Sequence, residues 1–97
     1  MSDRTLRLVI AGRVQGVGYR DFVQSRAQVL GVTGWVRNWR DGTVEAVVSG
    51  PPESLDELLA ACWRGPPAAR VADIQIEPVA AADAELPAAG LAIRPTP

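Results

Sequence analysis

The sequence predicts an α+β fold of the ferredoxin-like, split β-α-β type, with elements in the order β-α-β-β-α-β. Three observations support this prediction. Apolar residues alternate with a period of two in four segments, they recur at helical spacing in two others, and glycine or proline separates the segments. Because each helical segment has a single apolar stripe, we expect both helices to pack on one face of an antiparallel sheet.

The first half of the chain contains a predicted strand, a helix and a second strand. Leucine or isoleucine occupies every second position from 6 to 10, which indicates a strand that ends near Gly12. Residues 22–30 carry apolar side chains at helical spacing, and Gly31 is placed to end that helix. Strand-forming residues return at 32–39.

A hairpin is predicted where the second strand meets the third. Asp41 and Gly42 form an Asp-Gly pair between two strand-like segments, which is a strong hairpin signal. The returning strand covers residues 43–49, with Val44, Ala46 and Val48 on one face.

The second half supplies the remaining helix and strands. Ser54 and Glu57 have the spacing of a capping box, so we expect a helix to begin at Ser54 and to bury an apolar face over residues 55–62. Residues 71–79 alternate as a fourth strand and residues 80–90 resemble a loop. Leu91 and Ile93 are candidates for a short C-terminal edge strand.

Composition limits the chemistry. The chain has 97 residues, of which 47% are hydrophobic and 22% charged, so we expect one globular domain spanning residues 1–97. Histidine and lysine are both absent, which excludes imidazole bases, Schiff bases and a P-loop lysine. Cys62 is the single cysteine, and no apolar run is long enough to span a bilayer. We therefore expect a cytoplasmic protein without a membrane segment.

The charges are unevenly distributed along the chain. Residues 1–40 hold seven of the ten arginines and only two acidic residues, whereas residues 41–97 hold three arginines and nine acidic residues. A basic first half in a nearly neutral protein indicates either local attraction of an anion or a chance distribution of surface arginines.

A glycine-bearing stretch between the first strand and the first helix is the main candidate for chemistry. In residues 15–20, Gln-Gly-Val-Gly-Tyr-Arg, Gly16 and Gly18 allow a tight turn whose amides could converge on an anion. The following helix would add its N-terminal donors, and Arg20 a guanidinium suited to phosphate oxygens. The alternative is a turn that merely joins a strand to a helix.

Three stretches of the chain resemble the acylphosphatase family. Residues 12–20 read Gly-Arg-Val-Gln-Gly-Val-Gly-Tyr-Arg, residues 34–38 read Gly-Trp-Val-Arg-Asn, and residues 41–45 read Asp-Gly-Thr-Val-Glu. Residues 65–71 and the closing residues 90–94 are also similar to that pattern, with Leu91 where many members carry phenylalanine. The resemblance covers nearly the whole chain.

This resemblance implies metal-free hydrolysis of an acyl phosphate to a carboxylate and inorganic phosphate, with no cofactor. It assigns phosphoryl binding to Arg20 and positioning of the attacking water to Asn38. Main-chain donors would come from the loop residues Gln15, Gly16, Val17, Gly18 and Tyr19. We interpret the Tyr19 ring as a packing group, and the arginines at 13 and 37 as contributors to a positive field around the loop. Nothing in the sequence demands more than a monomer.

Two other functions use the same features. A non-catalytic anion-binding or regulatory module could have the same loop, as in the acylphosphatase-like domains of large carbamoyltransferases. An RNA-binding domain of this fold would need exposed aromatic residues on its central strands, and residues 43–49 contain none. We therefore expect no nucleic-acid partner.

Overall fold

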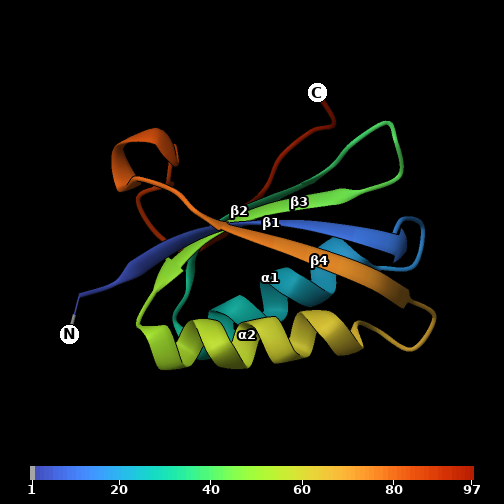
Figure 1. Ribbon diagram of the computed structural model, residues 1–97, viewed down its shortest axis with the longest axis horizontal. Helices are drawn as coiled ribbons and strands as arrows, with labels where there is room; N and C mark the ends of the chain where they lie inside the picture. The colour runs from blue at the N-terminus through green and yellow to red at the C-terminus, as the bar shows by residue number, and fades with distance from the viewer. Residues whose placement is uncertain (1) are drawn as a thin grey trace.

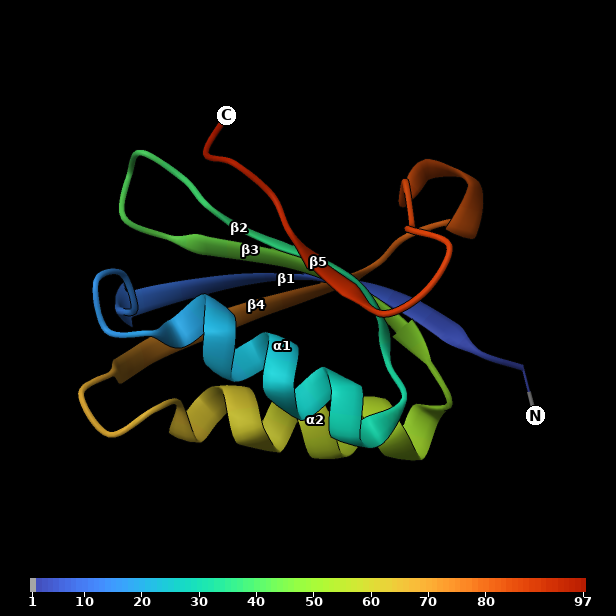
Figure 2. The same cartoon turned by 180° about the vertical axis from the view of Figure 1, so that it is seen from behind.

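The computed structural model describes residues 2–97, within which the chain forms five strands, two α-helices and one short 3-10 helix. Figure 1 shows the two helices side by side under one face of the sheet, and Figure 2 shows the same layers from behind. The elements are β1 (Arg4–Arg13), α1 (Tyr19–Leu30), β2 (Thr33–Asn38), β3 (Val44–Gly50), α2 (Pro52–Arg64), β4 (Arg70–Pro78), η1 (Ala81–Asp83) and β5 (Leu91–Ile93). The predicted order of strands and helices is confirmed.

The sheet has the strand order β4-β1-β3-β2-β5. The first four strands pair antiparallel, as predicted. The C-terminal edge strand also forms, but β5 pairs parallel to β2, with Gly34 opposite Leu91. It makes the sheet mixed because the connection from β4 crosses the sheet and brings β5 in along the same direction as β2 (Figure 2).

The main core lies between the helices and the sheet. It is formed by alternate residues of the strands and by the apolar stripes of both helices, including Ile10, Val23, Val36, Leu58 and Cys62, all at most 1% exposed. The glycine after α1 has φ 71° and ends that helix, and the Val32 amide donates to the Ala27 carbonyl at 2.9 Å.

The beginning of α2 differs from the capping-box prediction. The helix begins at Pro52, and neither Ser54 nor any other side chain caps it. The Leu55 amide instead donates to the Pro51 carbonyl at 3.0 Å. Proline in the first turn already has a helical φ and lacks the amide that would need a partner there, so the helix begins two residues earlier than Ser54.

Part of the sheet face opposite the helices is covered by the segment that follows β4. A second apolar cluster joins Trp35 and Val47 to Ala84 from the 79–90 segment, and the Trp35 indole donates to the Ala84 carbonyl at 2.8 Å. The predicted loop therefore contains η1 and packs against the sheet. No helix within residues 2–97 is long and apolar enough to cross a membrane.

Candidate active site

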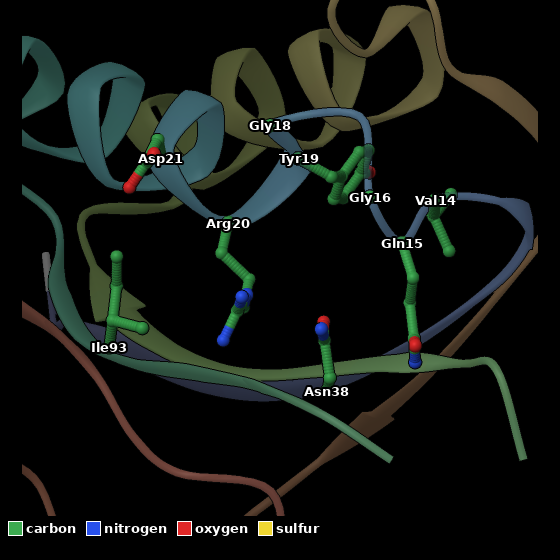
Figure 3. A pocket seen from close by; sticks show the side chains of 9 residues that line it. All are labelled: Val14, Gln15, Gly16, Gly18, Tyr19, Arg20, Asp21, Asn38 and Ile93. Atoms are coloured by element: carbon green, nitrogen blue, oxygen red, sulfur yellow. The ribbon is translucent and has the colours of Figure 1, made fainter. Parts of the chain in front are cut away.

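A pocket of about 290 Å³ lies where the β1–α1 loop, the beginning of α1 and the end of β2 meet. This volume is just below the roughly 300–1,000 Å³ typical of small-molecule sites, so the pocket suits a small ligand. Figure 3 labels the lining residues, which are Val14, Gln15, Gly16, Gly18, Tyr19, Arg20, Asp21, Asn38 and Ile93.

The predicted glycine loop adopts left-handed backbone conformations at both glycines. Gly16 has φ 72° and Gly18 has φ 79°, and a Cβ at either position would meet no atom within 4 Å. Backbone conformation, not lack of space, therefore favours glycine here. Gly18 is the N-cap of α1, so the loop leads directly into the positive end of the helix dipole.

Arg20 lies in the first turn of α1, and its guanidinium points into the pocket toward the sheet (Figure 3). It forms no ion pair with any carboxylate among residues 2–97. Its charge is therefore available to an anion in the pocket.

Asn38 is the last residue of β2, and its side chain rises from the sheet toward the loop and Arg20 (Figure 3). Its Oδ1 is buried and has no hydrogen-bond partner. A buried, unpartnered acceptor is costly unless a ligand or water completes it, so this atom marks a binding position in the pocket.

Gln15 contributes its side chain as well as its backbone. Its Nε2 donates to the carbonyl oxygens of Trp39 at 2.7 Å and Thr43 at 2.9 Å. These two residues flank the β2–β3 hairpin turn, so the Gln15 amide joins the glycine loop to the strand end that carries Asn38. Only main-chain donors were predicted for Gln15 from the sequence, and this side-chain contact was not predicted.

The two other predicted loop residues pack their side chains into the protein. Val17 packs against the main core. The Tyr19 ring is 1% exposed, and its hydroxyl donates to the Cys62 carbonyl of α2 at 2.7 Å. Burial raises the pKa of Tyr19 far above its usual value and that of the Cys62 thiol to about 11. Both side chains therefore stay neutral, in line with the packing interpretation of Tyr19.

The pocket end of the molecule is basic. Arg13 lies directly opposite Arg70 in the β1–β4 ladder, Arg40 lies in the β2–β3 hairpin, and all three are exposed. None of the three is ion-paired within residues 2–97. Unpaired positive charge beside a pocket attracts anions. Arg37 does not belong to this group, because its Nε binds Glu45 at 2.8 Å on the other sheet face.

Sequence reasoning missed Glu45, which is 4% exposed and the one charged residue buried among residues 2–97. Burial opposes its ionisation, but hydrogen bonds from Arg7, Trp39 and Arg37 outweigh that effect and hold the pKa of Glu45 below its usual value. Glu45 lies between Val44 and Ala46 in a strand that is buried on both faces, and this position was the signal that could have indicated its burial.

Comparisons with known proteins show which family this chain is similar to. The acylphosphatase family model matches residues 6–85. The acylphosphatase of Rhodospirillum rubrum is 51% identical over 80 residues, which cover 82% of this chain and 88% of that protein.

Solved structures are also similar to this chain. The crystal structure of acylphosphatase from Bacillus subtilis has a TM-score of 0.84 and 34% identity, covering 93% of this chain and 97% of that one. An acylphosphatase from Coxiella burnetii has a TM-score of 0.85 and 32% identity, covering 96% and 94%. The resemblance seen in the sequence is thereby confirmed, and the chain belongs to the acylphosphatase family.

Proposed function

We propose that Arg20 and Asn38 perform the two central tasks of this acylphosphatase, which hydrolyses a carboxylic–phosphoric mixed anhydride to a carboxylate and inorganic phosphate. Arg20 binds the phosphoryl group and Asn38 positions the attacking water. The observation that carries this assignment is the buried, unpartnered Oδ1 of Asn38 in the pocket that also receives the Arg20 guanidinium.

The phosphoryl group is bound by donors from the loop and the helix. The loop of residues 15–19 and the first turn of α1 offer backbone amides and the positive end of the helix dipole. Arg20 adds a permanent charge and a planar set of donors that match phosphate oxygens. The exposed arginines around the pocket raise the local concentration of anionic substrate.

The attacking water is held on the sheet side of the bound phosphate. One O–H group of this water donates a hydrogen bond to Asn38 Oδ1, which leaves a lone pair on the water oxygen directed at phosphorus. The new bond between water oxygen and phosphorus forms as the bond from phosphorus to the acyl oxygen breaks. The electron pair of the broken bond leaves on the carboxylate, and a phosphate oxygen takes the other proton of the attacking water.

This chemistry suits a chain without histidine or lysine. A carboxylate leaves without protonation, so no strong general acid is needed, and the transition state mainly requires positioning and charge stabilisation. Among the described residues that line the pocket, Asp21 is the one carboxylate, and it lies in the first turn of α1 where a negative charge is favourable.

We also propose a small acyl phosphate as the substrate, a monomer of one domain as the active form, and the cytoplasm as the location. The single thiol, Cys62, is buried and free, which suits a reducing compartment.

Hydrolysis of benzoyl phosphate, followed by its absorbance, tests the proposal. Arg20→Met should lower kcat/KM by about 10³-fold or more, the low end for an arginine on a transferred phosphoryl group, and should weaken competitive inhibition by phosphate. Asn38→Ala should lower kcat by about 10²–10³-fold, as for other single positioned groups, while phosphate inhibits it as well as it inhibits the wild type. Unchanged phosphate inhibition in Arg20→Met, or unchanged turnover in Asn38→Ala, would contradict the assigned role.

A further inference from the structure

The buried carboxylate of Glu45 is bonded to the two residues that flank Asn38. Its Oε1 accepts hydrogen bonds from Arg37 Nε at 2.8 Å and from Trp39 Nε1 at 2.8 Å. Its Oε2 accepts from Arg7 Nε at 2.6 Å. One carboxylate oxygen thus holds the chain immediately before and immediately after the residue proposed to position water.

Strand geometry places these contacts on the face away from the pocket. Successive side chains of a strand point to opposite faces, so Arg37 lies on the outer face and Asn38 on the helix face of the sheet. Glu45 pairs directly with Arg37 across the β2–β3 ladder. The Arg37 guanidinium also stacks on the rings of Trp35 at 4.7 Å and Trp39 at 4.9 Å, which keeps it in place.

Asn38 depends on its backbone for its position. Its Oδ1 makes no hydrogen bond within the protein, so no contact of that oxygen orients the amide before water binds. It is also the last residue of β2, where the strand gives way to the hairpin turn. Asn38 pairs with Val44 in the β2–β3 ladder, and beyond it the Trp39 amide donates to the Thr43 carbonyl at 2.9 Å. The contacts of Glu45 add side-chain support to the residues on either side of Asn38.

We propose that Glu45 is a positioning residue for catalysis, which acts through Arg37 and Trp39 to hold Asn38 at the distance from the bound phosphate that in-line attack by water requires. This inference rests on the proposed function of Asn38. Glu45 does not touch the substrate, since it lies on the opposite face of the sheet. Its effect should therefore fall on turnover and not on phosphate binding, which belongs to Arg20 and the glycine loop.

Glu45→Gln tests the inference. It keeps the shape of the side chain but removes the negative charge of the carboxylate that accepts three hydrogen bonds. We expect kcat for benzoyl phosphate to fall by about tenfold or more, since a displacement near 1 Å at a reacting group can cost about 10²-fold. The inhibition constant of phosphate should stay within about twofold of the wild-type value. General loosening of the site would instead weaken phosphate binding and lower kcat together.

Glu77→Gln is the matched control. Glu77 accepts from the same Arg7 at 3.0 Å, but it is exposed, and within residues 2–97 its side chain makes no hydrogen bond or ion pair with the β2–β3 hairpin. The same chemical change should therefore leave kcat and phosphate inhibition unaltered. A drop in kcat in Glu77→Gln equal to that in Glu45→Gln would show that loss of negative charge near Arg7 is the cause, and would overturn the inference.

Trp39→Phe decides the question if Glu45→Gln does not fold. Phenylalanine keeps an aromatic ring beside Arg37 but lacks the indole N–H that binds Glu45, so kcat should fall several-fold with unchanged phosphate inhibition. If Glu45→Gln folds and has the kcat of the wild type, the positioning role is refuted. If only Trp39→Phe folds, a wild-type kcat in that variant refutes the role. A wild-type chain with no turnover of benzoyl phosphate would refute the proposed function itself, and this inference with it.

Discussion

Replacing Gln15 by methionine should both destabilise the protein and weaken phosphate binding. Methionine has nearly the same length but no donor, so the change removes the hydrogen bonds from Nε2 to the Trp39 and Thr43 carbonyls. Those bonds join residues 24 and 28 positions apart in the sequence and hold the glycine loop against the hairpin.

The size of the expected loss of stability depends on the hydrogen bonds that the two carbonyls retain. The Trp39 carbonyl still accepts from the Gly42 amide at 3.2 Å, and the Thr43 carbonyl from the Trp39 amide at 2.9 Å. Neither is left without a partner, so each lost bond should cost only the net value of about 0.5–1.5 kcal/mol, or about 2 kcal/mol for the pair. For a domain of this size that lowers Tm by about 8–16 °C.

Urea unfolding and phosphate inhibition of benzoyl phosphate hydrolysis measure the two effects. We expect the inhibition constant of phosphate to rise several-fold, because the loop amides are no longer held in place. Gln24→Met is the matched control: Gln24 makes one such bond, to the Leu91 carbonyl at 2.9 Å, and does not line the pocket. It should lose about half as much stability and keep wild-type phosphate inhibition. A fully stable Gln15→Met with unchanged inhibition would refute the reasoning.

Three further outcomes are expected. Tyr19→Phe removes the donor to the Cys62 carbonyl, so it should cost about 1 kcal/mol or more in urea unfolding while kcat changes less than twofold; a large loss of kcat would give the hydroxyl a catalytic role. The pKa of Glu45 is lower in the folded than in the unfolded state. The stabilising effect of its carboxylate is therefore complete above the unfolded pKa and is lost as pH falls through the folded pKa. Urea unfolding between neutral and acid pH should show this loss of stability, and the loss should be smaller in Glu45→Gln. A chelator should leave benzoyl phosphate hydrolysis unchanged, because Arg20 and the loop amides supply the positive charge, and recovery of activity only with a divalent ion would contradict this.

Local rules predicted the elements well because their causes are local. The Asp41-Gly42 pair does form a hairpin turn, in which the Gly42 amide donates to the Trp39 carbonyl at 3.2 Å, and Gly31 does end α1. The capping box at Ser54 failed because a competing local rule, proline in the first turn, began α2 earlier.

The candidate site was predictable where motif and backbone conformation coincide. Gly16 and Gly18 adopt the positive φ that their residue type suggested, and Arg20 and Asn38 meet at one pocket although they are separated in the sequence. That Arg20 and Asn38 share a site was predicted from the resemblance to a family and not from the spacing of single residues. Ile93 could not be placed in the pocket, because that depends on how β5 pairs.

The order of strands and helices, the left-handed glycine loop and the absence of imidazole and amine chemistry were determined by the sequence alone, since residue type and short-range periodicity decide them. Tertiary structure decided the parallel pairing of β5, the link from the Gln15 side chain to the hairpin, and the burial of Glu45 beneath two arginines and a tryptophan. These features depend on strand register and on the face to which each side chain points. Contacts between distant segments determine the strand register and the face to which each side chain points, and no local sequence pattern predicts those contacts.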